Sequence, residues 1–138
     1  PSCRRCVDAC PTGAISPDRA SCSAALDADS SDLYSSHVDA SVCVSYLTQK
    51  ENPLSEREKN SLHHQLYGCD ICRSVCPFNT LSRPTERRVD LEKILALNED
   101  GFQKYFGPTA MSWRGLSILQ RNAQAVKNVI TAAERAGG

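Results

Sequence analysis

Two copies of one cysteine pattern constrain this chain more than any other feature. The first copy occupies residues 3–11 and the second residues 69–77, and both read C-x2-C-x3-C-P. The chain carries 8 cysteines among 138 residues, well above the usual share for a soluble domain. Because thiolates are the ligands that iron–sulfur clusters and zinc prefer, the pattern predicts a metal centre.

The spacing within each copy favours two [4Fe–4S] clusters with interleaved ligands. A C-x2-C turn brings two thiolates to one cluster, whereas the cysteine before the proline ligates the other cluster in two-cluster ferredoxins. The proline ends the turn and removes an N–H that would otherwise compete. Each copy is therefore expected to lend one ligand to the cluster of the other copy.

Two ligand sets follow from this spacing and from a count of ligands, in which Cys43 is the candidate for the fourth position of cluster B. Cluster A is expected to take three cysteines of the chain, namely Cys3, Cys6 and Cys76. Cluster B is expected to take four, namely Cys10, Cys43, Cys69 and Cys72. A full C-x2-C-x2-C-x3-C-P run would place the missing ligand of cluster A three residues before Cys3. We therefore expect the chain to be a piece of a longer polypeptide, and cluster A to be fragile in the piece alone.

Other readings of the same residues stay open at this point. Cys22, in a loop-like stretch, is expected to be a spare thiol, but it is also an alternative fourth ligand for cluster A. Structural zinc is the alternative for the whole set, although typical zinc sites do not need the trailing C-P. Disulfides are disfavoured because nothing indicates a secretory context. His37, His63 and His64 are alternative ligands in principle, but His63 and His64 are expected to be solvent-facing or packing residues.

The distribution of cysteines and apolar residues predicts a mainly α fold, with a small α+β arrangement as the alternative. Residues 1–82 are expected to form a ferredoxin-like double-cluster domain, in which residues 16–37 form a loop insertion. Residues 83–138 contain no cysteine and are expected to form a helical tail. One interpretation of this tail is the start of a HEAT-like helical repeat array.

Local signals predict the elements of the cluster domain beyond its motifs. A short buried segment is expected around Cys43 because apolar residues flank it: Val42, Val44, Tyr46 and Leu47. Ser55 and Glu58 have the spacing of a capping box, which indicates the start of a helix. That helix is expected to run through Leu62 and Leu66 to Gly68, a plausible C-terminal cap.

Three helices are predicted in the tail. Asp90 is expected to cap the first, and Asn98 a second that ends near Phe106. Apolar residues then recur at spacings of three and four, which is typical of an amphipathic helix. They are Leu116, Leu119, Ala123, Val126, Val129, Ile130 and Ala133.

Charge and hydropathy exclude some classes of protein. The formal net charge is zero, so no global basic field points to nucleic acid. Basic residues outnumber acidic ones only after residue 82. No apolar run approaches the ~20 residues of a membrane span, so we expect no membrane association and a cytoplasmic location.

Three blocks of sequence resemble the double-cluster domain of the epoxyqueuosine reductase family. They read CVDACPTGAI over residues 6–15, DASVCVSYLT over 39–48, and YGCDIC over 67–72 with CPFN over 76–79. The middle block discriminates, because C-x-S-Y-L-T is not a general ferredoxin feature. The linker between the first two blocks is longer than this family leads us to expect.

The resemblance implies a cobalamin-dependent oxidoreductase of tRNA modification. The chain would be its electron-relay part, passing electrons from a donor such as ferredoxin or flavodoxin through two [4Fe–4S] clusters to cobalamin, which reduces epoxyqueuosine to queuosine in tRNA. The resemblance implies the same two ligand sets, a catalytic domain outside this fragment, and a monomer. It also implies that Ser45 and Asp70 lie near cobalamin; their alternative role is hydrogen bonding around turns and clusters. The alternative function is a ferredoxin-like electron-transfer domain of another redox enzyme, without cobalamin.

Overall fold

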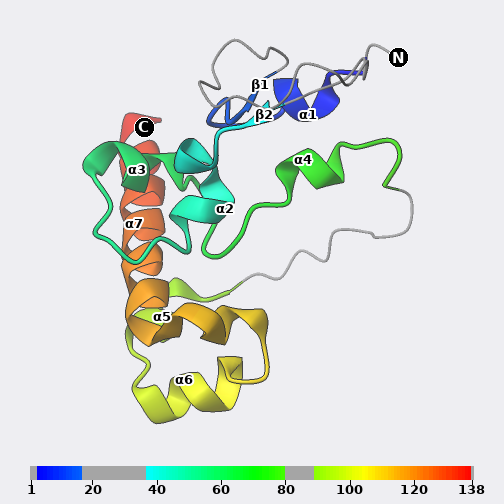
Figure 1. The fold of residues 1–138 in the computed structure, drawn as a ribbon. Coiled ribbons are helices and arrows are strands. Elements are labelled where there is room, and N and C mark those ends of the chain that lie inside the picture. The colour runs from blue at the N-terminus through cyan, green and yellow to red at the C-terminus, as the bar shows by residue number, and fades with distance from the viewer. Residues whose placement is uncertain (1–2, 17–36, 80–88, 138) are drawn as a thin grey trace. The chain divides into compact units, whose positions relative to one another are not determined.

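The computed structural model describes residues 3–16, 37–79 and 89–137. The described part is mostly helical, with one pair of very short strands (Figure 1), which confirms the expected mainly α class. The chain divides into two compact units, which we call the motif unit (Pro1–Cys43 and Asp70–Pro84) and the helical unit (Val44–Cys69 and Thr85–Gly138). The predicted boundary after residue 82 lies outside the described residues and stays a prediction.

The motif unit is built from single helical turns. Helix α1 (Arg5–Asp8) lies beside α4 (Ile71–Ser74), the corresponding turn of the second cysteine motif. A short 3-10 helix, η2 (Ala40–Val42), ends directly before Cys43. The helices that contain the second cysteine of each motif thus come together although more than 60 residues separate them in sequence.

A small antiparallel sheet completes the described part of the motif unit. Strand β1 (Ile15–Ser16) pairs with β2 (His37–Val38), in a register that joins Ile15 to Val38 and Ser16 to His37. We expected residues 16–37 to be a loop throughout, which is wrong at both ends. Two-residue strands are too short to show the alternation that identifies a strand in sequence. Residues 17–36, including Cys22, lie outside the described part.

The helical unit is organised around one long helix, α7 (Gly115–Ala136). Its other elements are short: α2 (Val44–Leu47), α3 (Glu56–Ser61), α5 (Leu91–Leu95), α6 (Glu99–Phe106) and the 3-10 helix η3 (Ala110–Arg114). Helix α7 packs against α3, α5 and η3, and α6 also packs against η3. Figure 1 shows α7 as the long orange-to-red helix with α3 beside it and α5 near its start.

The predicted helix starts are confirmed. Ser55 and Glu58 form a complete capping box, each side chain bonding the other's main-chain N–H. Asp90 caps α5 through the N–H groups of Glu92 and Lys93, and the Asn98 side chain accepts the N–H of Gly101 at the start of α6. A side-chain oxygen that accepts such an N–H satisfies a donor that the helix cannot, so these boundaries could be found from sequence.

The predicted end of α3 is wrong. The helix stops at Ser61, and His63 takes a left-handed conformation with φ of 51°. Leu66 and Gly68 therefore lie beyond the helix, although Gly68 does adopt the positive φ (71°) that a C-terminal cap would need. His63 and His64 are both exposed, which fits their expected solvent-facing role.

Two apolar clusters form the core of the helical unit. One joins α2 and α3 to the middle of α7: Val44, Leu47, Leu54, Leu62, Ala125 and Val126. The other joins α5 and α6 to the first half of α7: Ile94, Phe102, Leu119 and Ala123. The expected burial around Cys43 holds for Val44 and Leu47 but not for Val42 and Tyr46, which are exposed.

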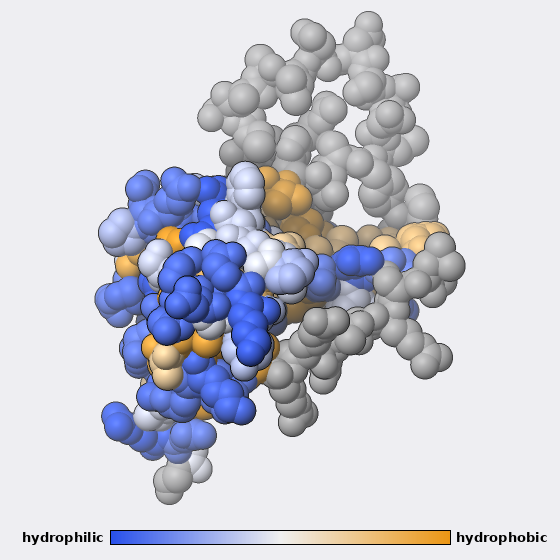
Figure 2. Space-filling view, turned by 90° about the horizontal axis from the view of Figure 1, so that it is seen from below, coloured by the Kyte–Doolittle hydropathy of each residue, from blue (hydrophilic) through white to orange (hydrophobic). Residues whose placement is uncertain are grey.

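The visible surface is mainly hydrophilic, with smaller apolar areas between polar ones (Figure 2). Several large apolar side chains are exposed on the described residues; they include Tyr46, Phe78, Tyr105 and Trp113. None of the helices described is long and apolar enough to cross a membrane.

Candidate metal centre

The two cysteine motifs adopt the same backbone conformation. The residue after the first cysteine starts each helix, with φ and ψ of −117° and 11° at Arg4 and −108° and 12° at Asp70. The residue that ends each helix, Ala9 or Val75, has φ near −85° and ψ near zero in both motifs. The repeated sequence therefore produces a repeated structure, as expected if both motifs do the same chemistry.

The same match continues past the helices, at the cysteines that precede proline. Cys10 donates its N–H to the carbonyl of Val7 across 3.2 Å, and Cys76 donates to Arg73 across 3.3 Å. Each cysteine then accepts an N–H on its own carbonyl, from Gly13 at 3.2 Å and from Asn79 at 3.1 Å. A tight turn thus follows each C-P step.

The surroundings of Cys10 favour its thiolate form. Burial raises the pKa of this thiol, but main-chain N–H groups at Thr12, Ala14 and Ile15 and the Thr12 hydroxyl lower it, and the net pKa lies below the usual value. The Thr12 hydroxyl lies 3.8 Å from the Cys10 sulfur. Metals bind the thiolate, and hydrogen bonds to ligand sulfurs are one means by which proteins tune iron–sulfur clusters.

All seven cysteines in the described residues are free of disulfides. Cys3 is exposed and the other six are half-buried. In the part of the chain that the structure describes, no three Cys, His, Asp or Glu side chains converge closely enough to hold a metal ion. The ligand set of cluster B takes Cys69 from the helical unit and its other members from the motif unit. Both ligand sets therefore stay predictions.

Cys69 is the last residue of its segment of the helical unit and packs against the first apolar cluster. The residue before it, Gly68, donates its N–H to the hydroxyl of Thr48 across 2.9 Å. Thr48 is fully buried and directly follows α2. This hydrogen bond thus fixes the main chain directly before Cys69.

The structure places Ser45 and Asp70 in different units. Ser45 lies on α2, half-buried, and its carbonyl accepts bonds from the side chains of Thr48 and Gln49. Asp70 is exposed and starts α4, but its carboxylate does not cap that helix. Their predicted position near cobalamin stays a prediction.

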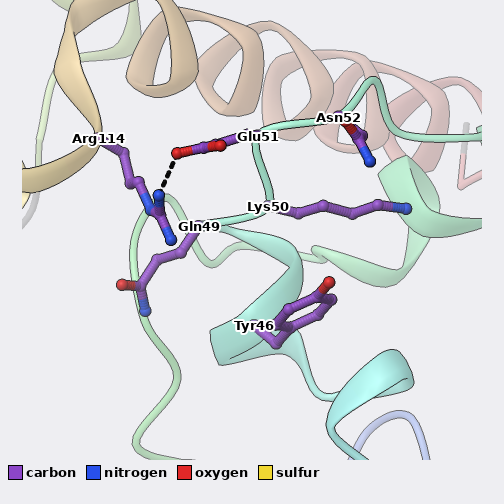
Figure 3. A pocket seen from close by; sticks show the side chains of 6 residues that line it. All are labelled: Tyr46, Gln49, Lys50, Glu51, Asn52 and Arg114. Carbon is purple, nitrogen blue, oxygen red and sulfur yellow. Dashed lines mark hydrogen bonds and ion pairs between the residues drawn. The ribbon is translucent and has the colours of Figure 1, made fainter.

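A polar pocket of about 330 Å³ opens beside α2 in the helical unit (Figure 3). Its lining residues are Tyr46, Gln49, Lys50, Glu51, Asn52 and Arg114. Arg114 forms an ion pair with Glu51, and Lys50 lies 2.6 Å from Glu58. Both cations of the pocket are thus paired with carboxylates, and neither Ser45 nor Asp70 lines it.

Comparison with known proteins decides the family. The model of the 4Fe-4S double cluster binding domain matches residues 1–79, which include both cysteine motifs and Cys43. The chain belongs to this family. Membership favours iron–sulfur clusters over the zinc alternative.

Relatives of the double cluster domain extend the similarity beyond the motifs. The chain is 35% identical over 132 residues to epoxyqueuosine reductase from Listeria monocytogenes, covering 88% of this chain and 30% of that protein. It resembles the structure of epoxyqueuosine reductase from Bacillus subtilis with a TM-score of 0.68 and 31% identity, over 93% of this chain and 32% of the other. A structure of epoxyqueuosine reductase with an epoxyqueuosine-modified tRNA stem loop matches with a TM-score of 0.67, 29% identity and the same coverage. The chain spans about a third of the length of these relatives.

The cysteines of the double cluster domain fit the family's cofactor. The motif turns have matching backbone angles at their caps, the described thiols form no disulfides, and hydrogen-bond donors from residues 12–15 act on the Cys10 sulfur. The sequence analysis did not predict that two polar residues of the helical unit, Thr48 and Asn122, are fully buried. The available signal was Asn122 itself, a polar residue between Leu119 and Ala123 on the apolar face of α7.

Proposed function

We propose that this chain is the electron-relay part of an epoxyqueuosine reductase. In the whole enzyme, electrons would pass through two [4Fe–4S] clusters to cobalamin for the reduction of epoxyqueuosine to queuosine in tRNA. The observation that carries the proposal is the pair of C-x2-C-x3-C-P turns, with matching cap angles and turn hydrogen bonds, within a double cluster domain. The similarity to epoxyqueuosine reductases over almost the whole chain supports the choice of enzyme.

The chain contributes ligands and their surroundings. We assign Cys3, Cys6 and Cys76 to cluster A. We assign Cys10, Cys43, Cys69 and Cys72 to cluster B. When bound, a [4Fe–4S] cluster takes up and gives back single electrons at a potential that burial and hydrogen bonds set. The N–H groups directed at the Cys10 sulfur would stabilise negative charge there and so raise that potential.

The finer structural expectations belong to this proposal too. We assign residues 1–82 to a ferredoxin-like cluster domain and residues 83–138 to a helical tail that starts a HEAT-like array. The packing of α5 and α6 with η3 and the first half of α7 supports a helical tail, and α7 also packs against α3. Ser45 and Asp70 are assigned to the surroundings of cobalamin.

The partners follow from the proposed reaction. Removing the epoxide oxygen as water consumes two electrons and two protons per substrate, so the enzyme needs a reducing donor such as ferredoxin or flavodoxin. The substrate would be tRNA, the location cytoplasmic and the state monomeric. The tail's basic excess would help to hold RNA phosphates. Arg87 and Arg88, the residues chosen to test this, lie outside the described residues; unchanged tRNA binding by the double alanine variant would refute the idea.

The test uses the whole cluster-loaded protein, assayed anaerobically with epoxyqueuosine-containing tRNA. Cys72→Ser is expected to abolish reduction while leaving tRNA binding intact, whereas Ser74→Ala on the same helix should leave both unchanged. Retained activity in Cys72→Ser would overturn the relay. A purified protein without the absorption band of cobalamin would favour the alternative, a ferredoxin-like domain of another redox enzyme.

A further inference from the structure

A chain of hydrogen bonds links helix α7 to the segment that enters Cys69. The Thr48 hydroxyl accepts the N–H of Gly68 at 2.9 Å and donates to the carbonyl of Ser45, also at 2.9 Å. One hydroxyl therefore joins the end of α2, five residues after Cys43, to the residue before Cys69. All of these bonds lie inside the helical unit.

Asn122 on α7 holds the same two segments through their carbonyls. Its amide nitrogen donates to the carbonyl of Thr48 at 2.6 Å and to that of Leu66 at 3.0 Å. Its amide oxygen accepts from Arg121 at 3.1 and 2.9 Å. This fully buried side chain uses both donor hydrogens and accepts two bonds, so its hydrogen-bonding capacity is complete.

Arg121 extends the network along the chain after α2. It donates to the carbonyls of Leu47 at 3.3 Å, Lys50 at 2.5 Å and Asn52 at 3.1 Å. The segment after α2 is thereby anchored to α7 at several successive carbonyls. Networks of satisfied buried polar groups fix a single arrangement of the segments that they join.

We propose that Thr48 and Asn122 are positioning residues for cluster B, acting within the helical unit by fixing the segment that presents Cys69 against α2, the helix that follows Cys43 in the sequence. The inference rests on the proposed ligand set, in which both cysteines serve that cluster. Gly68 forms the turn before Cys69. Its φ of 71° is a backbone conformation that residues other than glycine rarely adopt. Thr48 and Asn122 would set the direction in which the chain leaves that turn.

The chemistry of the network fits positioning better than core filling. Apolar residues of similar size, such as Val for Thr48 and Leu for Asn122, would occupy the same volume. They would leave the buried Thr48 carbonyl, and the part-buried Gly68 N–H and Leu66 carbonyl, without these partners. Groups that orient metal ligands without touching the metal typically account for a 10–100-fold difference in metal affinity or activity.

The same unit offers matched controls for both residues. Thr109 also donates to a carbonyl three residues earlier, that of Phe106 at 2.7 Å, and accepts an N–H, that of Met111 at 3.2 Å. Gln120 also lies on α7 and donates its amide to carbonyls, those of Ile94 at 3.3 Å, Leu95 at 3.1 Å and Leu97 at 3.0 Å. None of these control contacts involves a segment that presents a cysteine.

The experiment measures cluster B in the whole cluster-loaded protein. Thr48→Val, Asn122→Leu, Thr109→Val and Gln120→Leu are compared by loss of cluster absorbance in air and by the reduced EPR signal and midpoint potential of each cluster. Thr48→Val and Asn122→Leu are expected to lose cluster B about 10-fold faster and to change its signal while that of cluster A is kept. Thr48→Ser, which restores the hydroxyl, should restore the rate.

Each outcome decides the proposal. If all four variants lose cluster B at the same rate, or if its signal and potential do not move, the residues are structural and the proposal is wrong. If Thr48→Val unfolds, Thr48→Ser and the Asn122 variant still decide, through the EPR signal of cluster B. If the unmodified protein has no cluster B, the proposed ligand set fails instead of the positioning role.

Discussion

The Glu58 carboxylate lies 2.6 Å from the ammonium of Lys50 while also completing the capping box with Ser55. Lys50 follows α2 and Glu58 lies on α3, so the pair ties the start of α3 to the chain after α2. The Lys50 ammonium, with the main-chain and hydroxyl donors of Ser55, lowers the pKa of Glu58 from 4.5 to about 2.

The pKa of Glu58 predicts how stability depends on pH. A carboxyl whose pKa is lowered by folding stabilises the fold above its unfolded pKa, and this contribution is lost as pH falls from about 4.5 to about 2. Glu58→Gln keeps a capping-box side chain but removes the charge. We expect it to be less stable by about 1 kcal/mol at neutral pH and to have a flatter stability profile over that acid range. Urea unfolding at successive pH values measures both.

The matched control is Glu56→Gln, which makes the same change on α3 at an exposed carboxylate paired with Lys59 at 2.6 Å. Such exposed pairs stabilise little, so its profile should follow that of the unmodified protein. Identical acid profiles for Glu58→Gln and Glu56→Gln would show that the Lys50 pair does not contribute.

Gly68→Ala is expected to destabilise the helical unit through backbone strain alone. A Cβ at this position would meet no atom within 4 Å, but φ is 71°. Left-handed conformations cost residues other than glycine about 1–2 kcal/mol. Gly137→Ala, at φ of −98° with its nearest Cβ contact at 3.6 Å, should be neutral. Chemical denaturation followed by far-UV circular dichroism compares the two; equal stability would contradict the strain.

Phe102→Ala tests the second apolar cluster of the helical unit. The ring is fully buried among Ile94, Leu119 and Ala123, and its centroid lies 5.9 Å from that of Phe106. Removing it should cost about 3–5 kcal/mol. Tyr105→Ala, on the same helix but 64% exposed, should cost less than about 0.5 kcal/mol. Similar melting temperatures for the two variants would be incompatible with this core.

Substitution of single cysteines separates ligands from the spare thiol. Cys43→Ser should remove cluster B and about half of the iron, because a [4Fe–4S] cluster needs its complete ligand set. Cys22→Ser should leave the iron content unchanged. Iron analysis and EPR of the reduced proteins measure this. A loss of cluster A in Cys22→Ser would instead identify Cys22 as its fourth ligand.

What the sequence could predict depended on how local the signal was. Ser55, Asp90 and Asn98 cap helices through atoms within three residues, and all three helix starts were found. The end of α3 was missed because Leu62 is an apolar residue at helical spacing that stays fully buried after the helix has stopped. Burial alone does not distinguish a helix from the turn that follows it.

Long-range polar contacts could not be predicted in the same way. The partners of Asn122 lie 74 and 56 residues away, at Thr48 and Leu66, and no local pattern specifies them. The cysteine motifs are the opposite case, since their repeated spacing predicted both the repeated turn and the double cluster domain. The strand pair of Ile15 and Val38 was missed because each strand has only two residues.

Iron and acid-labile sulfide per chain, measured with an EPR spectrum after dithionite reduction, test the central claim most directly. The measurement uses the whole protein, purified anaerobically, so that the ligand expected three residues before Cys3 is present. We predict equal amounts, about eight of each for two complete [4Fe–4S] clusters, with the signal of reduced clusters. About four iron and four sulfide would mean that only one cluster is bound, which would support one proposed ligand set and refute the other. Zinc without acid-labile sulfide would contradict the iron–sulfur account altogether.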